Sequence, residues 1–308
     1  MNPDNPDQPK AATTRCGLIA IIGKPNVGKS TLLNFLMGQK LSITSRKPQT
    51  TRHRLLGIKT LANTQMVFVD TPGMHSGQNK AINRYMNKTV QSVIHDVDLI
   101  LFMVDRMKWS EEDELVLRHI KQCKTPVFLL LNKVDLVTDK DILLPYMEEI
   151  RQLHPFAEIF PLSALKEHNI EALESAIEKY LPKGDFYYPE DQLTDKNARF
   201  LAAEFIREKI TRQMGDELPY EVTVEIEEFD QDGKIIHISA LILVEKTGQK
   251  KIVIGEGGSR LKLIGTEARK DIEDLLGSKV MLKLWVKVKS GWSDDERALK
   301  SLGYDDLS

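Results

Sequence analysis

The chain has 308 residues, of which 41% are hydrophobic and 29% are charged, and its formal net charge is -2. This length exceeds the usual size of one domain, ~100-200 residues, and the apolar content can fill buried cores, so we expect two globular domains. The near-neutral charge argues against a protein that coats nucleic acid over its whole surface. Cys16 and Cys123 are too far apart to suggest a zinc site or a disulfide framework. So few cysteines are typical of a protein from a reducing cytoplasm.

Residues 1-14 are polar and lack the basic and then apolar order of a signal peptide, so we expect a disordered tail. The longest purely apolar run, 99-104, is far shorter than the ~20 residues of a transmembrane helix. These two observations predict a soluble, cytoplasmic protein that is at most peripheral to a membrane.

From 15 to 181, short apolar runs alternate with amphipathic stretches, a pattern typical of an α/β domain whose mostly parallel sheet is covered by helices. Asn63 lies between the second and third runs and predicts an antiparallel hairpin at one edge. The expected strands are 18-22, 55-60, 65-70, 98-104, 127-132 and 158-161. The expected helices are 30-38, 80-95, 111-122, 139-153 and 169-181.

Prolines and glycines punctuate the polar stretch 182-195, which predicts a linker. A smaller α+β domain is expected over 196-290, followed by a C-terminal tail over 291-308. Its expected elements are a helix at 196-213, strands at 220-229 and 234-245, a glycine-rich turn at 255-258, a helix at 259-276 and a strand at 279-289. Apolar neighbours alternate around Trp285 and predict that its side chain lies in the core, whereas the environment of Trp292 is left open.

The segment GKPNVGKS fits the pattern GxxxxGK[ST] between an expected strand and an expected helix. Such glycines let backbone N-H groups curl around phosphates at a helix N-terminus, while Lys29 reaches the β- and γ-phosphates and Ser30 ligates magnesium. A chance glycine turn is the alternative, and the flanking elements argue against it. The expected phosphate-binding residues are Gly23, Lys24, Pro25, Asn26, Val27, Gly28, Lys29, Ser30 and Thr31.

Three further motifs follow other expected strands. Asp70-Thr71-Pro72-Gly73 can present a carboxylate to magnesium and a backbone N-H to the γ-phosphate. In Asn132-Lys133-Val134-Asp135, a carboxylate can accept both N-H donors on the guanine edge, which adenine does not offer, so the motif favours GTP over ATP. Ser163-Ala164-Leu165 can close over the base through a backbone amide.

These four motifs stand in the order of the translation-factor-related GTPases, which the chain resembles over 18-181. The resemblance implies a switch segment whose threonine meets magnesium and the γ-phosphate: Thr51 is favoured, with Thr50 not excluded. The implied magnesium ligands are Ser30, Thr51 and Asp70, and the implied catalytic group is Lys29, Thr51, Asp70 and Gly73.

Two details bear on the rate of hydrolysis. Met74 occupies the position directly after the DxxG motif, where Ras-like proteins have a glutamine that orients water, so slow intrinsic hydrolysis is our hypothesis. Asn26 resembles the asparagine that binds potassium in the potassium-activated members of this class, where a cation stands in for an arginine finger.

The C-terminal half carries its charge unevenly. Eight acidic residues and no Lys or Arg occur over 216-232, whereas 246-289 contains eleven Lys or Arg against five Asp or Glu. A basic face favours a nucleic-acid partner, although surface lysines on a solvated helix would give the same count.

Within this region the sequence resembles the KH signature, an apolar residue followed by GxxG and a basic helix. That resemblance implies a turn that grips about four nucleotides of single-stranded RNA. The implied RNA-binding residues are Ile254, Gly255, Glu256, Gly257, Gly258, Arg260, Leu261 and Lys262.

Glu256 departs from the KH turns that carry a basic residue there, and a carboxylate near a phosphate weakens binding. The order of strands around the turn resembles the type II KH topology. A GTPase domain, a short linker and one C-terminal type II KH domain together resemble the Era family of bacterial ribosome-assembly GTPases, as do the segments RKPQTTRHR at 46-54 and GWSDDE at 291-296.

The family resemblance implies GTP and GDP as ligands with Mg²⁺, and small-subunit ribosomal RNA near its 3' end and the 30S subunit as partners. It also implies a monomer with some peripheral contact to the inner face of the cell membrane. Two other classes are the alternatives: an RNA-modifying or metabolic enzyme gated by GTP, and an RNA-binding scaffold with an inactive nucleotide site. The second half shows no catalytic cluster, and intact Lys29, Ser30 and Asp70 argue against an inactive site.

Overall fold

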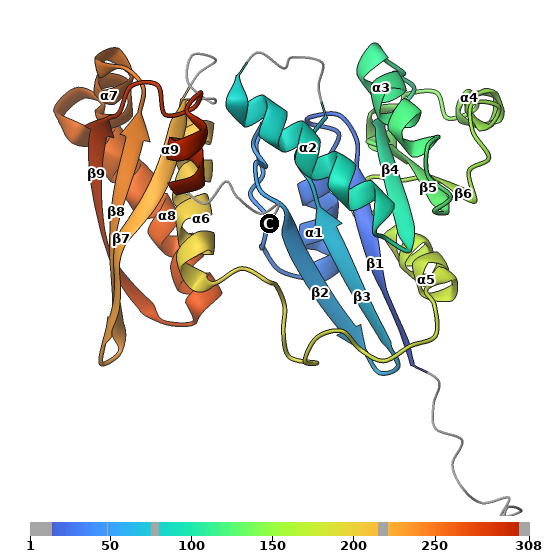
Figure 1. Cartoon of the computed structure of the whole chain (residues 1–308), viewed down its shortest axis with the longest axis horizontal. Coiled ribbons are helices and arrows are strands. Elements are labelled where there is room, and N and C mark those ends of the chain that lie inside the picture. The colour runs from blue at the N-terminus through green and yellow to red at the C-terminus, as the bar shows by residue number, and fades with distance from the viewer. Residues whose placement is uncertain (1–13, 48, 75–79, 215–220, 302–308) are drawn as a thin grey trace, which may run out of the picture.

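The computed structural model describes residues 14-47, 49-74, 80-214 and 221-301. The tail predicted over 1-14 lies outside the described residues except for Thr14, and the tail predicted over 291-308 is described only to residue 301. Two sheets form the centres of two domains, with the C-terminal domain lying beside the N-terminal one (Figure 1). No helix in the described part of the chain has the length and apolar character needed to cross a membrane.

The N-terminal domain is built on a six-stranded sheet with the order β2-β3-β1-β4-β5-β6. Neighbouring strands pair in parallel, except for the antiparallel edge pair of β2 and β3. This confirms the mostly parallel sheet and the antiparallel edge hairpin predicted from the sequence. The strands are β1 (Arg15–Ile22), β2 (Leu55–Leu61), β3 (Thr64–Asp70), β4 (Leu99–Asp105), β5 (Val127–Asn132) and β6 (Glu158–Pro161).

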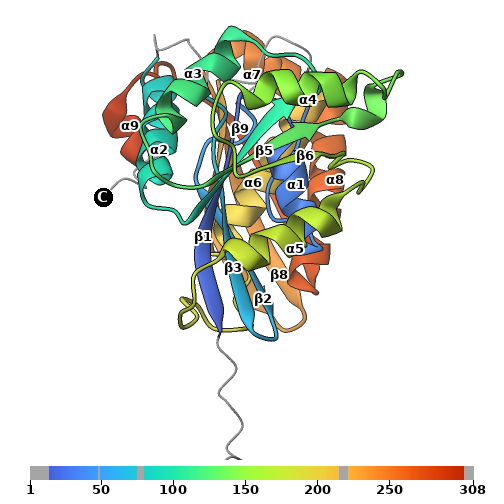
Figure 2. The ribbon, with the colours of Figure 1, turned by 90° about the vertical axis from the view of Figure 1, so that its right-hand side faces the viewer.

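Helices cover both faces of this sheet (Figures 1 and 2). The helices α1 (Lys29–Met37) and α5 (Ile170–Tyr180) pack their apolar sides on one face. The opposite face is covered by α2 (Ala81–His95), α3 (Glu111–Ile120) and α4 (Leu143–Arg151). Because β1, β3, β4 and β5 run in parallel, the loops after them meet at one edge of the sheet, where such folds bind ligands.

The helix predicted over 139-153 begins later, at Leu143. The Asp139 carboxylate accepts a hydrogen bond from the backbone N-H of Asp141 at 3.0 Å. Such a local bond from an aspartate side chain competes with helical hydrogen bonding, and the chain therefore forms a turn before the helix starts.

The C-terminal domain has a three-stranded sheet with the order β7-β8-β9. β7 (Val222–Asp232) pairs with β8 (Ile235–Val244) in antiparallel, and β8 pairs with β9 (Lys279–Val288) in parallel. The long helices α6 (Ala198–Gln213) and α8 (Ser259–Leu276) bury their apolar sides against the sheet. This is the predicted α+β domain, with two strands before the glycine-rich turn and one after it.

A short helix, α7 (Thr247–Ile254), precedes the turn η2 (Glu256–Gly258) and was not among the elements expected from the sequence. Its eight residues are too few to establish a helical period in the sequence. The Gln249 side chain accepts a hydrogen bond from the backbone N-H of Lys246 at 2.8 Å and so stabilises the first turn. The turn therefore connects two helices.

The two tryptophans of the C-terminal region lie in different surroundings, one exposed and one buried. The prediction that Trp285 lies in the core is wrong: its side chain is 50% exposed, because the helices cover only one face of the sheet. Trp292 is 1% exposed and packs with Ala81 and Ile82 of α2. The predicted tail thus carries a docked segment, which includes the short helix α9 (Glu296–Ser301).

The stretch 182-195 runs along the N-terminal domain. Ile58 donates its backbone N-H to the carbonyl of Leu193 at 2.9 Å, and Gln65 accepts hydrogen bonds from the backbone of Tyr187 and Tyr188. This connection is therefore bound to the edge of the first sheet before it enters α6 (Figure 1).

Candidate functional site

The glycine-rich loop between β1 and α1 has the backbone shape that phosphate binding requires. Gly28 has φ of 110°, and a Cβ atom there would lie 2.2 Å from Nδ2 of Asn132, so a side chain has no room. No side chain caps the N-terminus of α1, and its first turn contains no acidic residue. The backbone N-H groups at this helix end can therefore bind an anion.

Lys29 lies inside this loop, where its ammonium donates hydrogen bonds to the carbonyls of Gly23 and Lys24, both at 3.0 Å. Burial lowers the pKa of Lys29 to about 8, and the negative charge of Asp70 opposes that shift. A phosphate beside the ammonium would favour its charged form. The geometry thus holds the lysine at the position where the β- and γ-phosphates are expected.

Three oxygen ligands come together at the start of α1. The Ser30 hydroxyl lies 2.8 Å from Oγ1 of Thr51 and donates to Oδ2 of Asp70 at 2.8 Å. The Asp70 carboxylate also accepts from Ser42 at 2.7 Å, yet its Oδ1 has no hydrogen-bond partner among the described residues. Asp70 is fully buried, and this burial raises the pKa of its carboxyl while the bond from Ser42 and the charge of Lys29 lower it.

This oxygen set fits Mg²⁺, which prefers hard oxygen ligands and one or two carboxylates together with substrate phosphates. Ser30, Thr51 and Asp70 would hold the ion, and the ion would neutralise charge on the phosphates. Thr50 points elsewhere: its hydroxyl donates to the carbonyl of Lys47 at 2.7 Å and lies 2.6 Å from Oγ of Ser45. The geometry therefore favours Thr51 over Thr50.

The DTPG motif packs directly against the phosphate loop. A Cβ atom at Gly73 would lie 2.6 Å from the backbone nitrogen of Pro25, so only glycine fits at this contact. The Thr71 hydroxyl donates to the carbonyl of Ile21 at 2.9 Å and fixes the motif to β1. Met74 is 1% exposed and belongs to the apolar core beneath α2. The residue after the motif therefore presents no side chain to the nucleotide.

The guanine end of the site is held by a buried asparagine. Asn132 donates to the carbonyl of Val27 at 2.6 Å and accepts from the backbone N-H of Ala164 at 2.9 Å. Lys133 donates to the carbonyl of Asn26 at 2.8 Å, which links the same motif to the phosphate loop. The Asp135 side chain is exposed at the end of β5 and can meet a base from solution.

These elements border one open cavity of about 960 Å³. Most of the predicted nucleotide-binding residues line it: Pro25, Asn26, Gly28, Lys29, Ser30, Thr31, Thr51, Gly73, Asn132, Lys133, Asp135, Ala164 and Leu165. Other predicted residues do not line the cavity but lie behind the residues that do. Val27, Asp70, Thr71 and Ser163 are buried supports. Lys24 turns away, because its ammonium binds Ser110 and Asp113 at the start of α3.

Sequence reasoning missed several wall residues. The segment 43-47 lines the cavity, and so do Thr211 and Arg212 of α6, which belong to the C-terminal domain. Arg212 donates from Nε to the carbonyl of Thr44 at 2.9 Å. No sequence motif identifies these cavity residues, because the contact between Thr44 and Arg212 joins residues that are 168 apart in the chain.

The predicted RNA-binding turn is exposed on the C-terminal domain. Gly257 and Gly258 have φ of 55° and 79°, and a Cβ atom at either would meet no atom within 4 Å, so a ligand can approach the backbone. Glu256 and Lys262 are exposed beside them. The Arg260 guanidinium donates to the carbonyl of Ile252 at 2.8 Å and joins the two helices that flank the turn. Ile254, Gly255 and Leu261 are half-buried next to it.

Two family models match the chain, one in each domain. A family described as 50S ribosome-binding GTPase matches residues 18-133, and a KH domain family matches residues 217-293. GTPase Era of Pseudomonas fluorescens strain Pf-5 is 61% identical over 297 residues, covering 96% of this chain and 99% of that protein. GTPase Era of Pseudomonas putida strain F1 is 60% identical over 294 residues, covering 96% and 98%.

Two solved structures share the whole architecture, each with a TM-score of 0.91 over 94% of this chain and 99% of the other. One, 40% identical, is Era in complex with MgGDPNP and nucleotides 1506-1542 of 16S ribosomal RNA. The other, 39% identical, is an Aquifex aeolicus Era variant bound to GDP.AlF4-. Near full-length identity of 61%, together with the cavity and its four motifs, places this chain in the Era family of GTPases, enzymes that bind GTP and hydrolyse it.

Proposed function

We propose that this GTPase binds single-stranded RNA from the 3' end of small-subunit ribosomal RNA through the turn 255-258, and that it thereby assists assembly of the 30S subunit. One observation carries the proposal: the 40% identical Era structure with the same fold holds nucleotides 1506-1542 of 16S ribosomal RNA. The open space around the backbone of Gly257 and Gly258 supports it, because phosphates can approach N-H groups there.

The RNA proposal can be tested with a matched pair of variants. Gly257 and Gly277 share left-handed backbones, with φ of 55° and 60°, and a Cβ atom at either position would meet no atom within 4 Å. Gly257→Asp and Gly277→Asp therefore carry similar backbone strain, but only the first places a carboxylate in the predicted RNA turn. We expect Gly257→Asp alone to weaken binding of a 16S 3'-end RNA, measured by fluorescence anisotropy, and equal loss in both would contradict the turn as the site.

The affinity for RNA is proposed to depend on the nucleotide, with tighter binding in the GTP state. Contacts of Thr51 and Gly73 with the γ-phosphate would order the surrounding loops and reposition the C-terminal domain. Anisotropy with a GTP analogue, with GDP and without nucleotide measures this directly. Identical RNA affinity in all three states would refute the coupling.

Slow intrinsic hydrolysis is part of the same proposal. Met74 is packed in the core, so the residue after the DxxG motif cannot orient an attacking water. A potassium ion is the proposed substitute for a missing positive charge, with Asn26 of the phosphate loop as its ligand. In the structure the Asn26 side-chain amide donates to the carbonyl of Arg46 at 2.9 Å, which places the residue next to the switch segment. Equal turnover in sodium and potassium would remove potassium from the proposal.

The proposed cellular setting is a monomer in the cytoplasm, with some peripheral contact to the inner membrane that rests on the family resemblance alone. Light scattering of the purified protein tests the monomer. Flotation with vesicles of anionic lipid, at low and at physiological salt, tests the membrane contact, and protein that stays with the buffer in both conditions would exclude it.

A further inference from the structure

The threonine of the magnesium site sits between two residues that are bonded to the C-terminal domain. On one side, the carbonyl of Thr50 accepts a hydrogen bond from the Arg207 guanidinium at 2.5 Å. On the other, Arg52, fully buried, donates to the carbonyl of Val222 at 2.9 Å. Thr51 itself belongs to the nucleotide site, but α6 holds the backbone of Thr50 before it and β7 holds the side chain of Arg52 after it.

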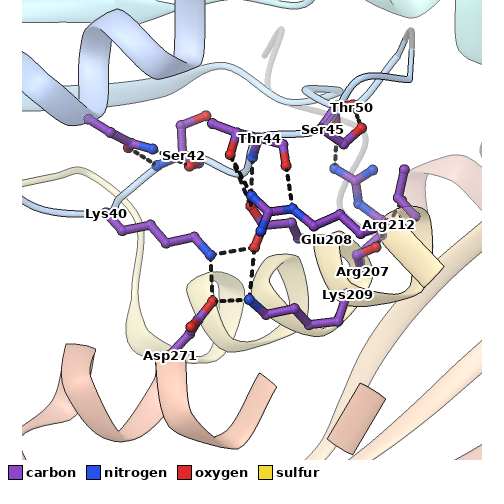
Figure 3. Close-up of polar contacts among 12 residues, drawn as sticks. Lys40, Ser42, Thr44, Ser45, Thr50, Arg207, Glu208, Lys209, Arg212 and Asp271 are labelled. Carbon is purple, nitrogen blue, oxygen red and sulfur yellow. Dashed lines mark hydrogen bonds and ion pairs between the residues drawn. The ribbon is translucent and has the colours of Figure 1, made fainter. Parts of the chain in front are cut away.

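A second anchor lies earlier in the same segment (Figure 3). Glu208 of α6 accepts hydrogen bonds from the backbone N-H of Thr44 at 2.8 Å and from its hydroxyl at 3.3 Å. Arg212, one turn further along α6, donates to the carbonyl of Thr44. Ile43 is 2% exposed and belongs to the apolar core of the C-terminal domain. Residues 43 and 44 are therefore fixed by packing and by hydrogen bonds at once.

Glu208 is buried among three cations. Its carboxylate is 0% exposed and is paired with Lys40 of the N-terminal domain and with Lys209 and Arg212 of α6. Asp271 of α8 binds the same two lysines. A buried carboxylate is stable only when cations and hydrogen-bond donors surround it. Here one cation, Lys40, and two donors, the backbone N-H and hydroxyl of Thr44, come from the other domain (Figure 3).

The segment 38-54 joins α1 to β2 and contains no helix or strand among its described residues. Ordering an irregular loop costs backbone entropy, so contacts with residues outside the loop must hold it in place. The contacts at 40, 43, 44, 50 and 52 supply them. These contacts come from the C-terminal domain. The N-terminal domain holds residues 41 and 42 of the segment as well, through Asn34 of α1 and through the Asp70 carboxylate.

We propose that Arg207 and Glu208 are positioning residues for the GTPase site: they hold the backbone around Thr51 so that its hydroxyl stays at the magnesium position beside Ser30. A helix of the C-terminal domain is therefore bonded to the segment that carries the magnesium threonine, and a movement of that domain on GTP binding would carry this segment with it. The proposal depends on the GTPase activity of the family and on no property of the RNA site.

Loosening the segment around Thr51 should change nucleotide binding in a way that a general loss of stability would not. GDP has no γ-phosphate, so a threonine that meets the γ-phosphate and its magnesium contributes to binding of GTP far more than to binding of GDP. Loosening the segment should therefore weaken a GTP analogue selectively. It should also expose the amides of 40-54 to solvent exchange in the nucleotide-free protein, where no ligand is involved.

The test compares full-length Arg207→Met and Glu208→Gln with the wild-type protein. Arg207→Met removes the donor to Thr50, and Glu208→Gln keeps the shape of the side chain but leaves its cations without that charge. The matched control is Arg269→Met, which breaks an ion pair with Glu273 on α8 that includes no residue of the segment. We expect about a tenfold loss in affinity for a non-hydrolysable GTP analogue in Mg²⁺, since one lost charged hydrogen bond has that size, with GDP affinity within about twofold.

Hydrogen exchange of the backbone amides measures directly whether the segment is loosened. Peptides covering 40-54 should exchange faster in both variants without nucleotide, and at the wild-type rate in Arg269→Met. Unchanged affinity for the GTP analogue would overturn the proposal, and so would equal losses for GTP analogue and GDP. If Arg207→Met fails to fold, Arg207→Lys decides by the same comparison, because it keeps the positive charge beside Glu204 while lacking the planar donor pair.

Discussion

Asn132 donates its side-chain amide to the carbonyl of Val27 at 2.6 Å, so the guanine motif at the end of β5 is fastened to the phosphate loop at the end of β1. The same side chain accepts from the N-H of Ala164, and Asn132 is only 3% exposed. One asparagine thus sets the spacing between the part of the pocket that receives the phosphates and the part that receives the base.

We therefore predict that Asn132→Ala weakens binding of GDP and of GTP analogues alike, by about 10- to 100-fold, because two buried polar groups lose their partner. Isothermal titration with both nucleotides measures this. A change in one nucleotide only would contradict the role of Asn132 as a support common to both.

Asp135→Asn should act on base recognition rather than on the framework. The Asp135 side chain is exposed, so its replacement should leave the melting temperature within about a degree of wild type. Loss of a carboxylate that accepts two guanine N-H donors should lower GDP affinity by about 100-fold, while xanthosine diphosphate, which presents an oxygen where guanine has its amino group, should bind more tightly. A variant that still prefers GDP would show that another group reads the base.

The location of this pocket could be predicted from the sequence because its motifs follow apolar strands that run in parallel, and such strands bring their carboxyl ends together. The strands of the first sheet were placed within a few residues for the same reason. Burial was harder to predict. The local pattern around Trp285 resembles a core strand, but whether a sheet face is covered depends on helices elsewhere in the chain.

Contacts between the domains could not be predicted from either half. Arg212 lines the nucleotide cavity through a hydrogen bond to Thr44, and nothing local in the sequence of α6 distinguishes it from a surface arginine. The helix α7 was missed because it is short, although its glycine-rich continuation was recognised. The spacing of apolar residues shows which side of a helix or strand is apolar, but it does not show which part of the protein packs against that side.

The pKa of Lys29 predicts how nucleotide affinity varies with pH. Burial holds this pKa at about 8 in the nucleotide-free protein, and neighbouring phosphates would raise it on binding. Because only the protonated lysine attracts phosphate, binding takes up a proton above pH 8 and affinity falls as pH rises. Between pH 7 and pH 8.5 the protonated fraction of Lys29 falls about fourfold, and GDP affinity should fall by the same factor.

Titration calorimetry at pH 8.5 in buffers of different ionisation enthalpy counts the protons taken up. The wild-type protein should take up most of one proton per GDP. Lys29→Met, which cannot titrate, should bind more weakly and show a smaller uptake. Absence of proton uptake in the wild-type protein would mean that Lys29 is already fully charged without nucleotide.

The two C-terminal tryptophans give a matched test of how the chain's end is held. Trp292 is buried against α2, where Ala81 and Ile82 donate their backbone N-H groups to Asp294 at 2.9 Å and to Ser293 at 3.4 Å. Trp292→Ala should lower the free energy of that docking by about 3-5 kcal/mol, as expected for a large buried side chain. Trp285→Ala, on the open face of the sheet, should change stability by less than about 1 kcal/mol. Hydrogen exchange at the first turn of α2 distinguishes the two variants. Exchange should accelerate only in Trp292→Ala, because loss of the packed indole frees both acceptors from the helix end. Equal protection in both variants would mean that the hydrogen bonds alone hold the segment.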